Sequence, residues 1–177
     1  MKAAIAAAFS LAAFASAFPA SADDVLARFK GGIGVIPVSN VAVVGTTAAD
    51  QVVTVSPNTV RGVAPAGQIW VIDKLDAKVK ADGSIKVKGK GLILGGGNSV
   101  GRATGQRVIA TLICEAAAPF VQRSTTAAGV LLADNGDFEI DDVLNSVPAE
   151  CASPMLLIRN AANGGWFAAG IVSFEKD

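Results

Sequence analysis

The stretch from Trp70 to Leu94, WVIDKLDAKVKADGSIKVKGKGLIL, constrains the fold more than any other part of the chain. Apolar and charged residues alternate on both sides of a glycine-containing turn. A period of two predicts an antiparallel hairpin with one apolar face and one basic face.

The turn of this hairpin can be chosen by requiring that like residues share a face. A two-residue turn of Asp82 and Gly83 would place Val79 opposite Lys86, which a half-buried sheet does not tolerate. A loop from Ala81 to Gly83 keeps the faces separate and lets Gly83 adopt a left-handed conformation. The predicted cross-strand pairs are Val79–Ile85, Ala77–Val87, Asp76–Lys88 and Lys78–Lys86.

The basic face of the hairpin is a candidate anion-binding face, formed by Lys78, Lys80, Lys86, Lys88 and Lys90. An acidic polysaccharide or a lipid headgroup would suit it. No nucleic-acid partner is expected, because the interleaved aromatic residues that such binding favours are missing. The interpretation we favour is structural: lysines at a sheet edge prevent strand-to-strand aggregation.

Residues 1–22 have the pattern of a secretory signal peptide. Lys2 precedes a run rich in Ala, Phe and Leu, and small-x-small sites end at Ala17 and Ala22. We expect cleavage after Ala22, which predicts a secreted or periplasmic protein exported from a bacterial cell. An uncleaved anchor is the alternative, but the run is short for a membrane span. No later stretch is apolar enough to span, so the mature chain should contain no membrane span.

Residues 23–177 have a size that normally forms one domain. Their apolar segments are short, rich in β-branched residues and separated by turn residues, and the chain lacks Tyr and His. We therefore predict an all-β fold: an antiparallel β-sandwich, immunoglobulin-like or jelly-roll-like, of about seven to nine strands. Without Lys2 the chain has 14 basic and 15 acidic residues, a formal charge of −1, so no global field recruits a charged partner.

The two cysteines, Cys114 and Cys151, fit an exported protein with one intramolecular disulfide. A redox-active pair would normally have a Cys-x-x-Cys spacing, which these residues lack. In the loop-entropy model a closure of this length stabilises the fold by about 3–4 kcal/mol.

Residues 23–68 have the least regular pattern. Val25, Leu26 and Phe29 have helical spacing, which predicts a short helix over 23–30 that Gly31 and Gly32 end. The segments after it read as short strands or extended chain at 33–37, 41–44 and 51–55.

The chain after the hairpin continues as strands. Residues 95–106, rich in glycine, form a flexible connection, and residues 106–115 are apolar on both faces, which predicts a central strand. Acidic and apolar residues alternate at 137–141, which predicts a strand with Phe138 and Ile140 facing inward and an acidic outer face. The other predicted strands are 120–125, 129–133, 154–160 and 166–174, with the last two forming a buried hairpin.

Three short motifs look catalytic but lack what their chemistry requires. Gly97–Gly101 matches the G-x-S-x-G nucleophile elbow, yet the chain has no histidine base and no helix follows the serine. The glycines at 95–97 lack the G-K-[ST] of a phosphate loop. Ser173–Lys176 matches S-x-x-K at the chain terminus, where no pocket can enclose it. We predict no catalytic residue and no cofactor.

Zinc or copper would lack their usual ligands in a chain without histidine and with both cysteines bonded. Calcium stays open as an alternative, although the oxygens gathered near residue 137 do not have the spacing of an EF-hand. Trp70 and Trp166 lie in apolar strands, so core packing is the expected role for both. The candidate calcium ligands are Asp134, Asn135, Asp137, Glu139, Asp141 and Asp142.

The leading functional hypothesis is a non-catalytic secreted or periplasmic module with a binding or structural role and a cell-surface or extracellular ligand. One alternative is anionic glycan or surface binding through the lysine face. The other is a glycosidase-like hydrolase, which needs two carboxylates facing each other across a cleft. The acids available to it are Asp73, Asp76, Glu115, Asp137, Glu139, Asp141 and Glu150.

Overall fold

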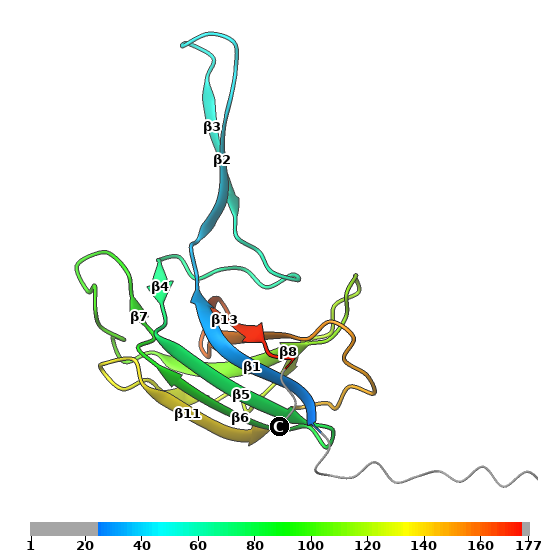
Figure 1. Ribbon diagram of the computed structural model, residues 1–177. Coiled ribbons are helices and arrows are strands. Elements are labelled where there is room, and N and C mark those ends of the chain that lie inside the picture. The colour runs from blue at the N-terminus through cyan, green and yellow to red at the C-terminus, as the bar shows by residue number, and fades with distance from the viewer. Residues whose placement is uncertain (1–24, 175–177) are drawn as a thin grey trace, which may run out of the picture.

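The computed structural model describes residues 25–174, and this part of the chain contains strands and no helix (Figure 1). The predicted signal peptide and its cleavage site lie outside the described residues. The strands are β1 (Val25–Gly34), β2 (Val38–Val44), β3 (Val52–Pro57), β4 (Trp70–Val71), β5 (Lys74–Lys80), β6 (Ser84–Lys90), β7 (Ile93–Leu94), β8 (Arg107–Ile113), β9 (Arg123–Ser124), β10 (Val130–Leu131), β11 (Phe138–Val143), β12 (Met155–Asn160) and β13 (Trp166–Val172).

Nine of these strands form one curled sheet in the order β10-β8-β12-β13-β1-β5-β6-β11, with β9 paired to β8. The two ends of that order, β10 and β11, contact each other, so the sheet curves around its own core as a half-barrel. Every ladder between these strands is antiparallel. The all-β antiparallel prediction is confirmed, and the sandwich-like core is enclosed by one curled sheet rather than by two separate sheets.

The predicted register of the lysine hairpin, β5–β6, is confirmed at every pair. Val79 faces Ile85, Asp76 faces Lys88, and Lys78 faces Lys86. Gly83 has a φ of +86° in the loop between the strands. The ends of the stretch also pair, since Trp70 lies opposite Leu94. The apolar face points into the core, where the valines at 79 and 87 and Ile85 are fully buried.

The expectation that this hairpin forms a sheet edge is wrong. Strand β1 pairs with β5 on one side and β11 pairs with β6 on the other, so both lysine strands are internal. The register places Asp141 of β11 opposite Lys86 and Glu139 opposite Lys88, so acids cover part of the lysine face. Lys86 Nζ lies 2.7 Å from the Asp141 carboxylate, and Lys88 Nζ lies 3.2 Å from Glu139.

Strand β8 is central and buried on both faces, as predicted, and β12–β13 forms the predicted buried hairpin beside it. The predicted disulfide between Cys114 and Cys151 is present. It joins the end of β8 to the segment before β12. The two bonded residues therefore tie together strands that already pair in the sheet.

The predicted helix at 23–30 is wrong, because residues from Val25 onward form β1. Ala27 and Phe29 are buried while the residues between and beside them are not, which is the period of a strand. Pairing with both β5 and β13 outweighs the local helical spacing. Gly31, at a φ of +86°, lies where the register with β13 shifts, so this glycine forms a bulge instead of ending an element.

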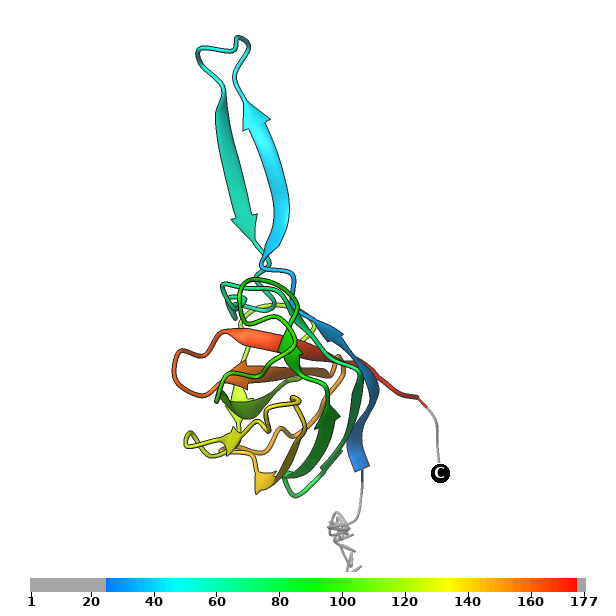
Figure 2. The same ribbon diagram turned by 90° about the vertical axis from the view of Figure 1, so that its left-hand side faces the viewer.

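Strands β2 and β3 form a hairpin that projects away from the curled sheet (Figures 1 and 2). We call residues 36–57 the arm. Its base is fixed to the body through Val35, which is fully buried and whose N–H donates to Phe167 O at 2.8 Å. Asn58 closes the other side, with its side-chain amide donating to Ile36 O at 3.0 Å.

Candidate functional site

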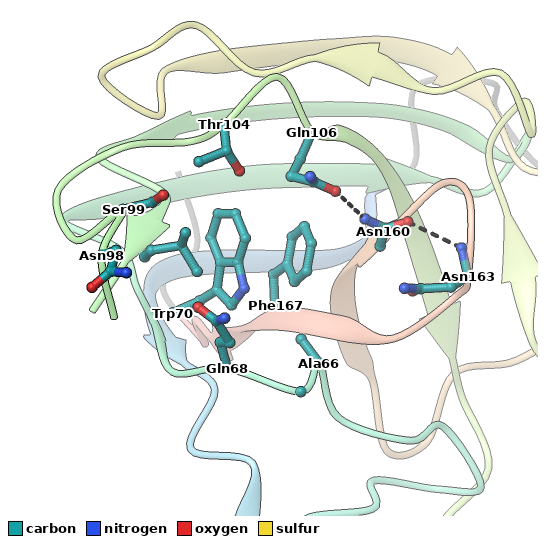
Figure 3. Close-up of a pocket in the computed structure, with 12 residues that line it drawn as sticks. Ala66, Gln68, Trp70, Asn98, Ser99, Thr104, Gln106, Asn160, Asn163 and Phe167 are labelled. Atoms are coloured by element: carbon teal, nitrogen blue, oxygen red, sulfur yellow. Dashed lines mark hydrogen bonds between the residues drawn. The ribbon is translucent and has the colours of Figure 1, made fainter. Parts of the chain in front are cut away.

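A cavity of about 510 Å³ opens beside the loop at 95–106, between that loop and the turn that joins β12 to β13 (Figure 3). Two aromatic rings and two aliphatic residues contribute its apolar part. Its polar lining consists of amides and hydroxyls: Gln68, Asn98, Ser99, Thr104, Gln106, Asn160 and Asn163.

The aromatic part of the cavity is a stacked pair, Trp70 on β4 and Phe167 on β13. The ring centroids lie 4.0 Å apart at an interplanar angle of 18°. Each residue is less than 5% exposed, at 4% for Trp70 and 3% for Phe167, so the rings form a floor and not a projecting platform. Trp166 is also buried and donates its indole N–H to Asn58 O at 2.9 Å. The core-packing prediction for both tryptophans is confirmed.

One wall of the cavity is a preorganised set of amides (Figure 3). Asn160 donates its side-chain amide to Gln106 Oε1 at 2.6 Å and accepts the N–H of Ala162 at 2.7 Å and of Asn163 at 3.0 Å. Asn163 in turn accepts the N–H of Gly165 at 3.0 Å. These bonds fix the orientation of the amides before any ligand arrives, which lowers the entropy cost of binding.

The opposite wall has polar groups without partners. Within residues 25–174, no hydrogen bond involves the side chains of Gln68, Asn98, Ser99 or Thr104. Thr104 also has a φ of +53°, which is unusual for a β-branched residue and is strained. Strain of this kind tends to collect at functional sites. This wall can therefore offer hydrogen bonds to a ligand without breaking bonds within the protein.

The chemistry of the cavity follows from its residue types. None of its lining side chains is ionisable. The cavity therefore lacks an acid, a base and a charged nucleophile, and a charged ligand would find no counter-charge there. Amides and hydroxyls both donate and accept hydrogen bonds, and the volume lies in the range of small-ligand sites. A neutral, hydroxyl-rich ligand fits this chemistry.

The structure places the predicted lysine face on the outside of β5 and β6, where acids interrupt it. Lys86 and Lys88 form ion pairs with β11. Lys88 and Lys90 also line a second hollow of about 330 Å³, together with Lys74, Asp76 and Asp73. The surface is thus of mixed charge, and anion binding by these lysines stays a prediction.

Five of the seven acids proposed for a hydrolase separate into three places; of the other two, Asp137 accepts the N–H of Gly91 at 3.2 Å and Glu150 is exposed next to Cys151. Asp73 and Asp76 share the second hollow, while Glu139 and Asp141 lie on β11 and bind lysines. Glu115 lies beside the disulfide, where the N–H of Val121, together with Arg123 at 2.9 Å, lowers its pKa to about 2. A carboxyl group with that pKa stays ionised at neutral pH and cannot act as a general acid.

The candidate calcium ligands are not brought together. Residues 25–174 contain no group of three or more His, Cys, Asp or Glu residues placed to hold a metal ion. The Asp142 carboxylate instead accepts the N–H groups of Thr126 at 2.8 Å and Val143 at 2.7 Å, which lowers its pKa. The geometry gives the calcium alternative no support.

The loop that matches the nucleophile elbow supplies polar side chains to the lining of the cavity, and not a catalytic serine. Ser99 and Asn98 line it, but no base is present to activate the serine. The other lining residues come from four separate segments, and neither spacing nor alternation connects them in the sequence. The one available signal was the concentration of Asn, Gln, Ser and Thr in turns that flank buried strands.

Comparison of the chain with protein-family models, curated proteins and solved structures finds no match. Among the described residues there is no helix that is long and apolar enough to cross a membrane.

Proposed function

We propose that the protein is a non-catalytic binding module whose cavity takes a neutral, hydroxyl-rich ligand such as a segment of an uncharged glycan. The observation that carries this proposal is the lining of the cavity: amides and hydroxyls around an aromatic floor, without an ionisable side chain. A sugar presents hydroxyls at its edge and C–H groups on its face, so its edge suits the walls and its face suits the floor.

We further propose that the ligand is met outside the cytoplasm. The disulfide is compatible with an oxidising compartment, and the signal-peptide pattern of residues 1–22 points to secretion or the periplasm. Mass spectrometry of the exported protein tests this directly. The expected mature N-terminus is Asp23, and an intact Met1 in the protein recovered from cells would contradict it.

The binding proposal is tested with an array of neutral oligosaccharides, followed by calorimetry on any saturable hit. Gln68→Ala/Asn98→Ala removes two side chains that have no internal hydrogen bond to lose, so the fold should be unaffected. We expect binding to weaken at least tenfold, which corresponds to about 1.4 kcal/mol. Gln51→Ala removes an exposed amide on the arm and serves as the matched control, with unchanged binding. Absence of saturable binding to every neutral glycan, or equal binding by the double variant, would refute the proposal.

A hydrolase remains the alternative that one observation favours, since Asp73 and Asp76 line the same hollow. Turnover on a panel of glycoside substrates, abolished by Asp73→Asn or by Asp76→Asn, would establish it. Asp134→Asn, which alters an acid outside that hollow, is the control. Under the binding proposal no turnover is detected with any of these proteins.

Anionic glycan binding through the lysine face predicts retention on a heparin column at physiological salt. Lys78→Glu/Lys86→Glu should abolish that retention, because it reverses two charges on neighbouring strands. Passage of the unmodified protein straight through the column at low salt would eliminate this alternative, since exposed charges interact most strongly there.

A further inference from the structure

The arm exposes an apolar face that the body of the protein does not cover. In the β2–β3 register Val41 lies opposite Val55 and Val43 lies opposite Val53, so these four side chains share one face. Their residues are 55–62% exposed. We call this set the valine face. Monomeric proteins seldom expose a contiguous apolar surface without a binding role for it.

The arm also lacks the charges that normally keep an exposed hairpin soluble. Between Lys30 and Arg61 the single charged residue is Asp50, which lies at the tip of the hairpin. Sheet edges are usually protected by lysine, by bulges or by a covering segment. Neither strand of the arm carries a lysine, and within the described chain each pairs only with the other.

The base of the arm is held firmly, so the arm is presented in a defined direction. Besides the bonds of Val35 and Asn58, Arg61 follows β3 and donates to Ser153 O and to Ser153 Oγ, each at 2.6 Å. Arg61 also donates to Ile113 O at 3.1 Å, next to the disulfide. A surface that is fixed before association loses less entropy on binding than a flexible one.

We infer that the valine face is an interface between two copies of this chain, with the arm of one copy packed on the arm of the other around a twofold axis. A twofold contact requires a self-complementary surface. The valine face meets that requirement because it is apolar and uncharged, so it repels nothing on its copy. A charged partner would find no complementary charge on it.

The size and the edges of the arm support the same partner. Strand β2 has seven residues and β3 has six, and a twofold contact pairs the arm with a surface of the same size on the second copy. At the ends of the main sheet, β9 and β10 are very short, and β11 pairs with β6 alone but carries Glu139, Asp141 and Asp142. The strands of the arm have no basic residue to match these acids, so neither end of the sheet suits the arm of another copy. The arm of the second copy is the partner of matching length.

Sedimentation velocity over a range of concentrations tests this inference. We expect the unmodified protein to form dimers in the micromolar range. Val43→Lys/Val53→Lys places two charges on the valine face and should weaken the dimer at least tenfold. The matched control, Val44→Lys/Val52→Lys, adds the same charges to the neighbouring opposed pair on the other face and should leave the dimer intact.

A second, milder double variant controls for the possibility that the lysine substitutions unfold the arm. Val41→Thr/Val55→Thr keeps the β-branched shape that strands favour and should still weaken the dimer. Circular dichroism and the urea midpoint, measured on each variant, report whether the body is intact. The inference does not depend on the glycan proposal, because the cavity and the valine face share no residue.

Three results would overturn the inference. The unmodified protein could be monomeric at all concentrations, or both lysine variants could dissociate equally. The third is that the monomer floats with vesicles of phosphatidylcholine and phosphatidylglycerol in a manner that Val43→Lys/Val53→Lys abolishes, which would make a lipid surface the partner of the arm.

Discussion

The two hairpins of this protein, the arm and the lysine hairpin, have strands of nearly equal length but place their apolar side chains in opposite environments. In β5–β6 the apolar face is buried and the lysines face outward, whereas in β2–β3 valines are exposed on both faces. One hairpin stabilises the body, and the other adds a surface. Apolar content alone therefore does not identify a core strand, because the valines of the arm are as apolar as those of β5 and β6 and remain exposed.

The largest expected contrast comes from the same substitution in the two hairpins. Val87→Ala removes a fully buried side chain and should lower the free energy of unfolding by about 2 kcal/mol, at about 0.8 kcal/mol for each carbon plus a cavity contribution. Val53→Ala removes an exposed one and should change it by less than about 0.5 kcal/mol. Urea denaturation of dilute protein measures both, and equal losses would erase the distinction between the hairpins.

The turns provide the next contrast. Gly83 has a φ of +86°, and a Cβ there would lie 2.7 Å from Val147 Cγ2 in the body. Gly83→Ala should therefore lower the free energy of unfolding by about 1–2 kcal/mol. Gly45 in the arm has a φ of +132° and would place a Cβ 2.5 Å from Asp50 O.

Strain at Gly45 should stay local, because the arm can open without exposing the core. We expect Gly45→Ala to leave the urea midpoint unchanged and to speed proteolytic cleavage near Asp50. A fall in the midpoint as large as that of Gly83→Ala would show that the arm unfolds together with the body.

The same contrast explains what could be predicted from the sequence. Lysines alternate with apolar residues in β5 and β6. A shift of one strand by one residue would place its lysines on the apolar face of the other strand, so the sequence determines the register. The arm contains consecutive valines, as at Val43 and Val44, and parity cannot show which face is buried. Strands were predicted there, but not their projection from the body.

Long-range contacts account for the remaining errors. The helix predicted at 23–30 had the spacing of Val25, Leu26 and Phe29, yet pairing on both sides makes this segment a strand. The sequence predicts an edge position for the lysine hairpin because nothing local shows that β11 pairs with β6. The cavity was missed because its walls come from separate turns, and Asn98 and Ser99 looked informative only as a failed catalytic motif.

A fall in pH should affect stability through a carboxylate in the body, Glu115, and not through one in the arm, Asp50. Glu115 in the body has a folded pKa of about 2, below its ordinary 4.5, chiefly because the N–H of Val121 donates to it. A lowered pKa stabilises the fold above the unfolded value and loses that contribution as the pH falls from about 4.5 toward 2. Hydrogen bonds from Thr47 lower the pKa of Asp50 at the arm tip, but no core contact depends on that residue.

Glu115→Gln should thus lower stability at neutral pH and flatten its dependence on acid, whereas Asp50→Asn should leave the urea midpoint unchanged at every pH. Denaturation at a series of pH values from 7 to 2 measures both. An acid dependence that is the same in Glu115→Gln as in the unmodified protein would show that other groups control it.

The smallest expected effect concerns the ion pairs that cover the outer face of the lysine hairpin. The side chains of Lys86 and Asp141 are 66% and 61% exposed, so their attraction is largely screened by water. A double-mutant cycle with Lys86→Ala and Asp141→Ala should give a coupling of about 0.2–1 kcal/mol that shrinks in salt. A coupling well above that range would mean that charge pairing, and not the buried valines, holds β11 to the sheet. With a small coupling, the lysines mainly keep this face soluble and select an acidic neighbour. The strands of the arm carry no charged residue and provide neither function.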